Sequence, residues 1–187
     1  MILYLHGFRS SPASIKATMM ARHMELAGRA GDFFCPQLPA SPSAAIALAS
    51  QLCEERHPRA IIGSSLGGYY ATWLAEQVGC RAVLLNPAIK APRALSSYVG
   101  ISTLYNSNEP FEFKEEYIHE LPLYAVERIT RPERYFLIAA TGDEVLDWRE
   151  MVAHYPGSRQ RIIEGSDHGI TDFDEYINEI MAFCDAS

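Results

Sequence analysis

The chain has 187 residues, of which 48% are hydrophobic and 21% are charged, as in a soluble globular protein with one core. It carries 16 Lys and Arg residues against 23 Asp and Glu residues, and the net charge of −7 argues against a nucleic-acid partner because it repels phosphate backbones. No apolar run approaches the length of a membrane span, so no membrane partner is expected.

Short apolar segments alternate with segments of helical periodicity along most of the chain. The segments with the composition of buried parallel strands are Ile2–Leu5, Phe33–Cys35, Arg59–Gly63, Ala82–Leu85, Arg134–Ala140 and Arg161–Ile163. This alternation predicts βαβ units with right-handed crossovers. The expected fold class is therefore α/β, a three-layer sandwich in which helices flank a parallel sheet.

Helices are expected between these strands, with capping residues at several of their ends. These markers are Ser11-Pro12 and Gly28 for the first helix, Ser41-Pro42 for the second, Gly79 for the end of the third, Asp147 and Pro156-Gly157 for the fourth, and the acids Asp172, Asp174 and Glu175 in the first turn of the last.

Residues 88–132 break the alternation and are predicted to be a small insertion within a single domain of residues 1–187. The segment contains too many aromatic and aliphatic residues for a solvated loop. Two interpretations remain open. These side chains either seal the edge of the sheet, or some of them form a cap with a pocket for an apolar acyl group.

The four cysteines, Cys35, Cys53, Cys80 and Cys184, are widely spaced in apolar contexts and form no CxxC pair. Buried, reduced thiols are therefore expected. Together with an amino-terminal segment that looks like a strand of the mature fold, they predict a cytoplasmic location. We predict no metal site, because there is no His-x-His and His119-Glu120 is followed by leucine at position 123.

The stretch Gly63-Ser64-Ser65-Leu66-Gly67 lies between a predicted strand and a predicted helix. This is the context of a nucleophile elbow, in which the central serine, here Ser65, adopts a strained conformation above the strand ends. Side chains at positions 63 and 67 would collide with neighbouring backbone, so glycine is required there. The pentapeptide occurs by chance in some chains; the flanking strand and helix make it informative.

A serine hydroxyl needs a base to become a nucleophile, and imidazole has a suitable pKa. His168 is the candidate, because it lies in a loop directly after the last predicted strand. The other histidines are less well placed: His23, His57 and His154 in or at the ends of helices, His119 in the insertion, and His6 where it is better suited to bracing its loop.

The imidazolium needs a carboxylate partner. Asp143 follows the strand that precedes the His168 strand, as the chain order Ser, Asp, His requires. Asp147 is the serious alternative, although it is also well placed as a helix N-cap. Glu144 and Asp167 are less favoured.

An oxyanion hole requires two donors. The backbone N–H of Leu66, at the start of the helix after the elbow, is one candidate. The second is the N–H of Phe8, in the glycine turn His6-Gly7-Phe8 after the first strand.

Taken together, these motifs resemble the α/β-hydrolase fold, and more narrowly the small YqiA-type bacterial esterases. The resemblance spans nearly the whole chain and also rests on Ser10-Ser11-Pro12, on Asn86-Pro87-Ala88 and on the tyrosine-rich insertion; Gly165-Ser166 departs from an expected glycine pair. It implies a minimal six-stranded sheet, a catalytic Ser65, Asp143 and His168, no cofactor, and activity on short acyl esters and on acyl-CoA thioesters.

We therefore predict a serine hydrolase that cleaves small-molecule carboxylic esters or thioesters through an acyl-enzyme. Two alternatives remain: a non-catalytic binding or scaffold domain on the same fold, and an amide or peptide hydrolase that uses the same triad. The physiological substrate, the acyl chain length and the oligomeric state are not encoded in these motifs.

Overall fold

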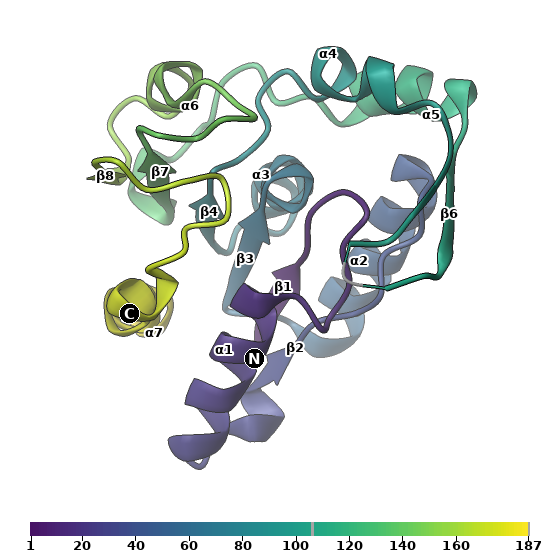
Figure 1. Cartoon of the computed structure of the whole chain (residues 1–187). Helices are drawn as coiled ribbons and strands as arrows, with labels where there is room; N and C mark the ends of the chain where they lie inside the picture. The colour runs from purple at the N-terminus through teal and green to yellow at the C-terminus, as the bar shows by residue number, and fades with distance from the viewer. Residues whose placement is uncertain (106, 187) are drawn as a thin grey trace.

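The computed structural model describes residues 1–105 and 107–186. Asn106, within the predicted insertion, and Ser187 lie outside the described residues. The predicted parallel sheet flanked by helices is confirmed: six strands run in the order β2-β1-β3-β4-β7-β8, and every pairing is parallel (Figure 1). These strands are β1 (Ile2–Leu5), β2 (Phe33–Phe34), β3 (Ala60–Ser64), β4 (Arg81–Leu85), β7 (Tyr135–Ala140) and β8 (Arg159–Ile163).

Helices cover both faces of this sheet. The α-helices are α1 (Ile15–Leu26), α2 (Pro42–Arg56), α3 (Leu66–Val78), α4 (Ala91–Leu95), α5 (Glu115–Glu120), α6 (Trp148–His154) and α7 (Ile177–Asp185). Side chains of α1 and α7 form the core on one face, whereas those of α2, α3 and α6 form the core on the other. Among residues 1–105 and 107–186, no helix combines the length and the apolarity that crossing a membrane requires.

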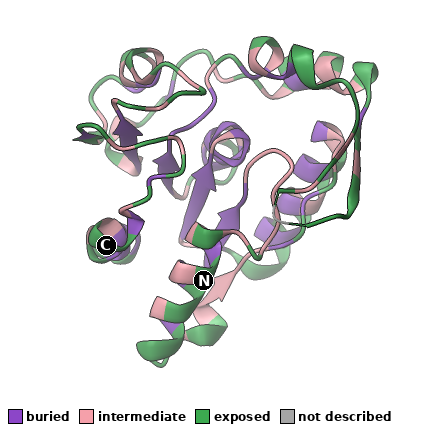
Figure 2. Ribbon diagram, in the orientation of Figure 1, coloured by how far each residue is buried: buried purple, intermediate pink, exposed green. Residues whose placement is uncertain are grey.

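The central strands β1, β3, β4 and β7 are almost wholly apolar because each contributes to both cores. Leu3 and Leu5 of β1 face the α2 and α3 layer, whereas Ile2 and Tyr4 face the α1 and α7 layer. Successive side chains of a strand point to opposite faces, so a strand covered on both sides shows a continuous apolar run. Figure 2 shows these central strands as buried.

Two predicted helix starts are wrong. Helix α1 begins at Ile15, with Ser14 as its extended N-cap residue, and not at Ser11-Pro12. The Ser11 hydroxyl instead accepts from the N–H of Ala13, which makes a short turn before the helix. The start of the last helix is also misplaced, because α7 begins only at Ile177. The acids Asp172, Asp174 and Glu175 lie in or just before the preceding 3-10 turn, Phe173–Tyr176.

The insertion contains an antiparallel hairpin that the sequence did not predict, made of β5 (Gly100–Thr103) and β6 (Pro110–Phe113). Its apolar residues divide into two groups. Phe113 and Leu121 are fully buried, whereas Ile101 is 82% exposed. Short 3-10 segments complete the fold: Ala30–Asp32, Ser96–Tyr98, Leu121–Tyr124 and Pro132–Arg134.

The four cysteines are free thiols. Cys53 and Cys184 are buried as predicted, but Cys35 and Cys80 are only partly buried. Burial raises the pKa of each thiol, to about 12 for Cys35 and Cys80, so these groups stay protonated at neutral pH.

The strand order predicts a crevice at the carboxyl ends of β1 and β3. The chain passes from β1 to β2 on one side and then returns to place β3 on the other side of β1. At such a reversal the loops after the two strands diverge and leave a crevice at their carboxyl ends. The segments that follow β1 and β3 are the glycine turn with Phe8 and the elbow with Ser65.

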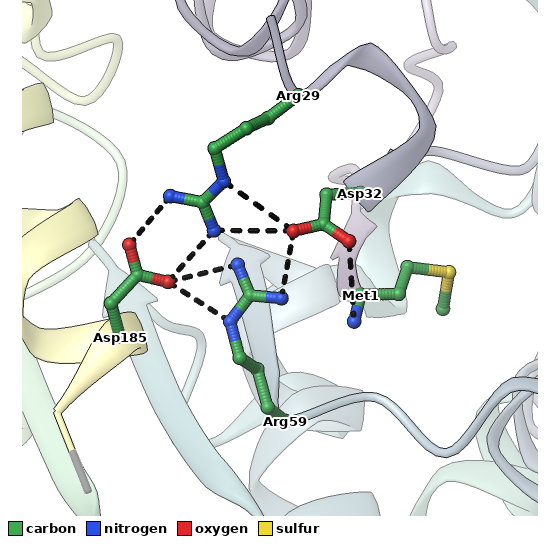
Figure 3. A network of polar contacts seen from close by, with 5 residues as sticks. All are labelled: Met1, Arg29, Asp32, Arg59 and Asp185. Atoms are coloured by element: carbon green, nitrogen blue, oxygen red, sulfur yellow. Dashed lines mark hydrogen bonds and ion pairs between the residues drawn. The ribbon is translucent and has the colours of Figure 1, made fainter. Parts of the chain in front are cut away.

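A network of ion pairs lies at the opposite, amino-terminal edge of the sheet. Figure 3 shows Arg29 and Arg59 between the carboxylates of Asp32 and Asp185. Arg29 lies 2.7 Å from Asp185 and 3.2 Å from Asp32, and Arg59 lies 2.9 Å and 3.2 Å from the same two residues. The amino group of Met1 is 3.9 Å from Asp32. The network therefore ties the end of α7 to the starts of β2 and β3.

Asp185→Asn is expected to lower the melting temperature at neutral pH. Hydrogen bonds from Arg29 are the main reason that the pKa of Asp185 is lowered to about 2. A carboxyl whose pKa is lower in the folded state than in the unfolded state stabilises the fold above the unfolded value, about 3.9. The contribution is lost as the pH falls through the folded value. Thermal unfolding of both proteins from pH 7 to pH 2 should therefore show a difference that shrinks below about pH 4.

Asp174→Asn, which removes the same charge from an exposed aspartate outside the network, is the control. A difference between Asp185→Asn and the unchanged protein that stays constant down to pH 2 would contradict the proposed role of the carboxylate.

Candidate active site

The backbone at Ser65 has the conformation expected of a nucleophile elbow. Its φ of 54° and ψ of −119° lie in a region that non-glycine residues rarely adopt, at a cost of about 1–3 kcal/mol. The N–H of Ser65 donates to Leu85 O at 3.0 Å, and its carbonyl accepts from Gly68 and Ala88. The end of β3, the start of α3 and the segment after β4 thus hold the strained residue in place.

The two glycines of the motif are required by close backbone approaches, as predicted. A Cβ on Gly67 would collide with the carbonyl group of Leu5, and a Cβ on Gly63 would collide with the carbonyl group of Gly67. Helix α3 can therefore begin directly against β1 and β3 only when both positions lack a side chain.

The structure brings the three predicted catalytic side chains together. His168 Nε2 lies 3.1 Å from Ser65 Oγ, and His168 Nδ1 lies 2.7 Å from Asp143 Oδ2. These side chains come from the loops after β8, β3 and β7, which end at the same edge of the sheet. Hydrogen bonds at both ring nitrogens orient the imidazole between the hydroxyl and the carboxylate.

These partners define the tautomer. A carboxylate only accepts, so Nδ1 donates to Asp143 and Nε2 is left to accept the hydroxyl proton of Ser65. This is the protonation state that a general base requires.

The side chain of Asp143 is buried, and both of its oxygens accept hydrogen bonds. Its side chain has no exposed surface, and its Oδ1 accepts from the N–H groups of Val145 and Leu146, both at 2.8 Å. These two donors fix the carboxylate so that Oδ2 faces the imidazole.

Asp147, the alternative acid, is occupied elsewhere. It is the N-cap of α6, and its carboxylate accepts from the N–H of Arg149 at 2.9 Å. Its side chain is 50% exposed. The structure thus places Asp147 in the capping role that the sequence also allowed.

The loop that carries Phe8 runs directly against the elbow. A Cβ added to Gly7 would lie 3.3 Å from Ser65 Cβ, so the turn packs closely on Ser65. Phe8 and Leu66 both line the cavity that contains Ser65 and His168. The Phe8 ring packs edge-on against Tyr98, Phe111 and Phe113 of the insertion, with centroids 5.0–5.5 Å apart.

His6 braces this loop, as interpreted from the sequence. Its Nε2 accepts from the N–H of Leu38 at 3.0 Å, and its Nδ1 therefore donates to Gly7 O, also at 3.0 Å. Burial lowers the pKa of His6, which favours the neutral ring that this pattern needs.

Comparison with protein-family models identifies the family of this chain. A family model described as an uncharacterised protein family, UPF0227, matches residues 1–185. The chain belongs to the UPF0227 family. Solved structures with the α/β-hydrolase fold resemble this UPF0227 chain across almost its whole length, which confirms the predicted fold.

Three such structures are the mouse α/β hydrolase domain-containing protein 10, the esterase domain of a Rhodothermus marinus protein, and Est1E of Butyrivibrio proteoclasticus with ferulic acid bound. The mouse protein has a TM-score of 0.71 at 17% identity, covering 96% of this chain and 88% of its own. The Rhodothermus domain has a TM-score of 0.69 at 16% identity, covering 97% of this chain and 85% of its own. Est1E has a TM-score of 0.72 at 14% identity, covering 96% of this chain and 87% of its own. At these identities the comparisons establish the fold.

Asn86 organises the site of this UPF0227 protein, although its place in the sequence predicts no such role. Its side-chain amide donates to the carbonyl oxygens of Asp167 and His168, both at 3.1 Å, and its Oδ1 accepts from the N–H of Ala140 at 2.8 Å. Asn86 is 1% exposed and has a φ of 42°. The local sequence signal for this conformation is an asparagine between a buried strand and a proline. Asparagine tolerates a positive φ better than most residues.

Glu144 also supports the histidine loop. Its carboxylate accepts from the backbone N–H of His168 at 3.0 Å. From the sequence, Glu144 is only a less favoured candidate for the acid that orients the imidazole. Sequence spacing cannot predict this contact, because Glu144 and the backbone of His168 are far apart in the chain.

The UPF0227 site opens into a cavity of about 480 Å³. Part of its apolar lining comes from the insertion and from the loop after β7: Leu95, Tyr98, Tyr105, Val145 and Leu146. This volume is in the range of sites for small organic ligands. Among residues 1–105 and 107–186, no three His, Cys, Asp or Glu side chains are grouped so that they could hold a metal ion.

Proposed function

We propose that this protein is a serine hydrolase that cleaves carboxylic esters or acyl thioesters of small molecules. One observation carries the proposal. The Ser65 hydroxyl, the His168 imidazole and the buried Asp143 carboxylate form a continuous hydrogen-bonded chain, with distances of 3.1 Å and 2.7 Å. This arrangement matches the general requirement for an activated serine nucleophile, whatever fold carries it.

In the proposed reaction, Ser65 Oγ attacks the acyl carbon while His168 Nε2 takes the hydroxyl proton. Asp143 stabilises the imidazolium, and the N–H groups of Leu66 and Phe8 stabilise the oxyanion. The intermediate collapses when His168 returns the proton to the leaving alcohol or thiol. Water, activated by the same imidazole, then attacks the acyl-enzyme and releases the acid.

We propose that residues 88–132 form a cap that walls the acyl pocket. Leu95, Tyr98 and Tyr105 of this segment line the cavity that contains Ser65. The same segment contacts the oxyanion loop, because Arg9 Nε donates to Thr103 O at 2.7 Å and the N–H of Tyr105 donates to Arg9 O at 2.6 Å. Both contacts support an insertion that is part of the site.

A fluorophosphonate probe and a graded series of substrates test this function. We expect covalent labelling of Ser65, located by peptide mass spectrometry, and turnover of para-nitrophenyl esters with a cut-off in acyl length set by the cavity. Acyl-CoA thioesters of the same lengths compare the two substrate classes. Absence of both labelling and turnover would overturn the proposal and favour a binding domain. Cleavage of anilides in preference to esters would favour an amide hydrolase.

A further inference from the structure

The cavity beside Ser65 contains an ammonium group that the proposed mechanism does not use. Lys16, in the first turn of α1, lines the same cavity as Ser65 and His168. Its Nζ donates to the carbonyl oxygen of Gly169 at 2.6 Å. The partly buried lysine therefore lies next to the residue that follows the proposed base.

The ammonium group of Lys16 still has N–H donors available for a ligand. An ammonium group has three N–H donors, and the bond to Gly169 uses one. The two nearby carboxylates have other partners: Asp167 accepts from the N–H and the hydroxyl of Thr171, and Asp143 accepts from the His168 ring. Within the part of the chain that the structure describes, Lys16 forms no ion pair.

The lysine is positively charged at neutral pH. Desolvation lowers the pKa of Lys16 to about 8, and the charges of Asp167 and Asp143 oppose this shift. A charged donor in a partly desolvated cavity binds anions more strongly than one in open solvent, because water competes less for it.

The position of Lys16 indicates which part of a substrate it meets. In the proposed reaction His168 Nε2 returns its proton to the leaving group, so the leaving group must lie at the His168 side of the cavity. Lys16 lies at that side, through its bond to Gly169. The carboxylate of Glu144 also lines the cavity, but it accepts from the N–H of His168.

We propose that Lys16 binds an anionic group, a carboxylate or a phosphate, on the leaving alcohol or thiol of the substrate. The inference rests on the proposed hydrolase function and narrows its substrate class. Lys16 then acts as a specificity residue: it favours acidic leaving groups by lowering KM, and no bond forms or breaks at its nitrogen.

Three chromogenic esters test this proposal. They are para-nitrophenyl butyrate, its analogue with a carboxylate on the nitrophenyl ring, and para-nitrophenyl hemiglutarate, which carries the carboxylate on the acyl side. The purified protein is compared with Lys16→Met, Lys16→Gln and Lys16→Arg. Arg22→Met, which removes one positive charge from an exposed position of the same helix, α1, outside the cavity, is the control.

We expect both neutral variants to reduce kcat/KM for the acidic leaving group, relative to para-nitrophenyl butyrate, by about tenfold or more. The loss should appear in KM, Lys16→Arg should restore most of the preference, and Arg22→Met should not alter it. An equal fall in kcat for all three esters would overturn the proposal, because Lys16 would then only hold the His168 loop. A selective loss for the hemiglutarate would overturn the leaving-group assignment. If the unchanged protein cleaves none of the esters, the proposed function itself fails, which is a distinct result.

Discussion

Ser65→Ala is expected to abolish fluorophosphonate labelling and to reduce ester turnover by about 10⁶-fold, the scale found when one member of a catalytic triad is removed. The loss is this large because the variant has no atom that can form the acyl-enzyme. Serine already adopts the positive φ of the elbow at this position. Alanine carries the same Cβ and should adopt it at a similar cost, so the fold and the cavity should remain. Turnover with para-nitrophenyl butyrate, normalised to folded protein by circular dichroism, measures the effect.

The neighbouring serine supplies a matched control. Ser64 is the last residue of β3 and precedes the strained position. Ser64→Ala should retain covalent labelling, whereas labelling that survives in Ser65→Ala would show that the nucleophile had been assigned to the wrong residue.

Asp143→Asn is expected to reduce kcat by about 10⁴-fold with little change in KM. The asparagine Oδ1 can still accept from the N–H groups of Val145 and Leu146, so its amide NH₂ must face the imidazole. An NH₂ group cannot accept from Nδ1–H, and His168 must therefore move its proton to Nε2. In that tautomer Nε2 can no longer accept the proton of Ser65.

Asp147→Asn separates the two candidate acids. Asparagine is as good an N-cap as aspartate, so this change should preserve both α6 and the rate. A large loss of kcat in Asp147→Asn, together with normal kcat in Asp143→Asn, would reverse the assignment of the orienting acid. Steady-state kinetics on the two variants decide between these outcomes.

The sheet could be predicted from sequence because its central strands are buried on both faces. Ile2–Leu5 and Tyr135–Ala140, for example, are uninterrupted apolar runs. The hairpin of β5 and β6 left no such signal, since most of its residues are exposed and its strands pair with each other outside the main sheet. The start of α1 was misplaced because Ser11 and Ser14 are both good cap residues, and only the local turn decides between them.

The candidate site could be predicted in part for a similar reason. Ser65 directly follows β3 and His168 lies in the loop after β8, so strand order brings them to one edge of the sheet. The choice between Asp143 and Asp147 depends on the conformation of one loop, which sequence spacing does not determine. Asn86 and Lys16 act on the backbone of the histidine loop, and such contacts join residues that no periodic pattern relates.

The packing of the Phe8 ring against the insertion has a consequence for attempts to engineer this protein. The backbone of Phe8 is the proposed oxyanion donor, while its ring contacts Tyr98, Phe111 and Phe113 of the proposed cap. A library of cap variants selected to accept larger acyl chains would thereby also displace the amide that stabilises the transition state. Broader substrate range and fast turnover would have to be optimised together, by varying the contacts of Phe8 and the lining of the pocket in the same round of selection.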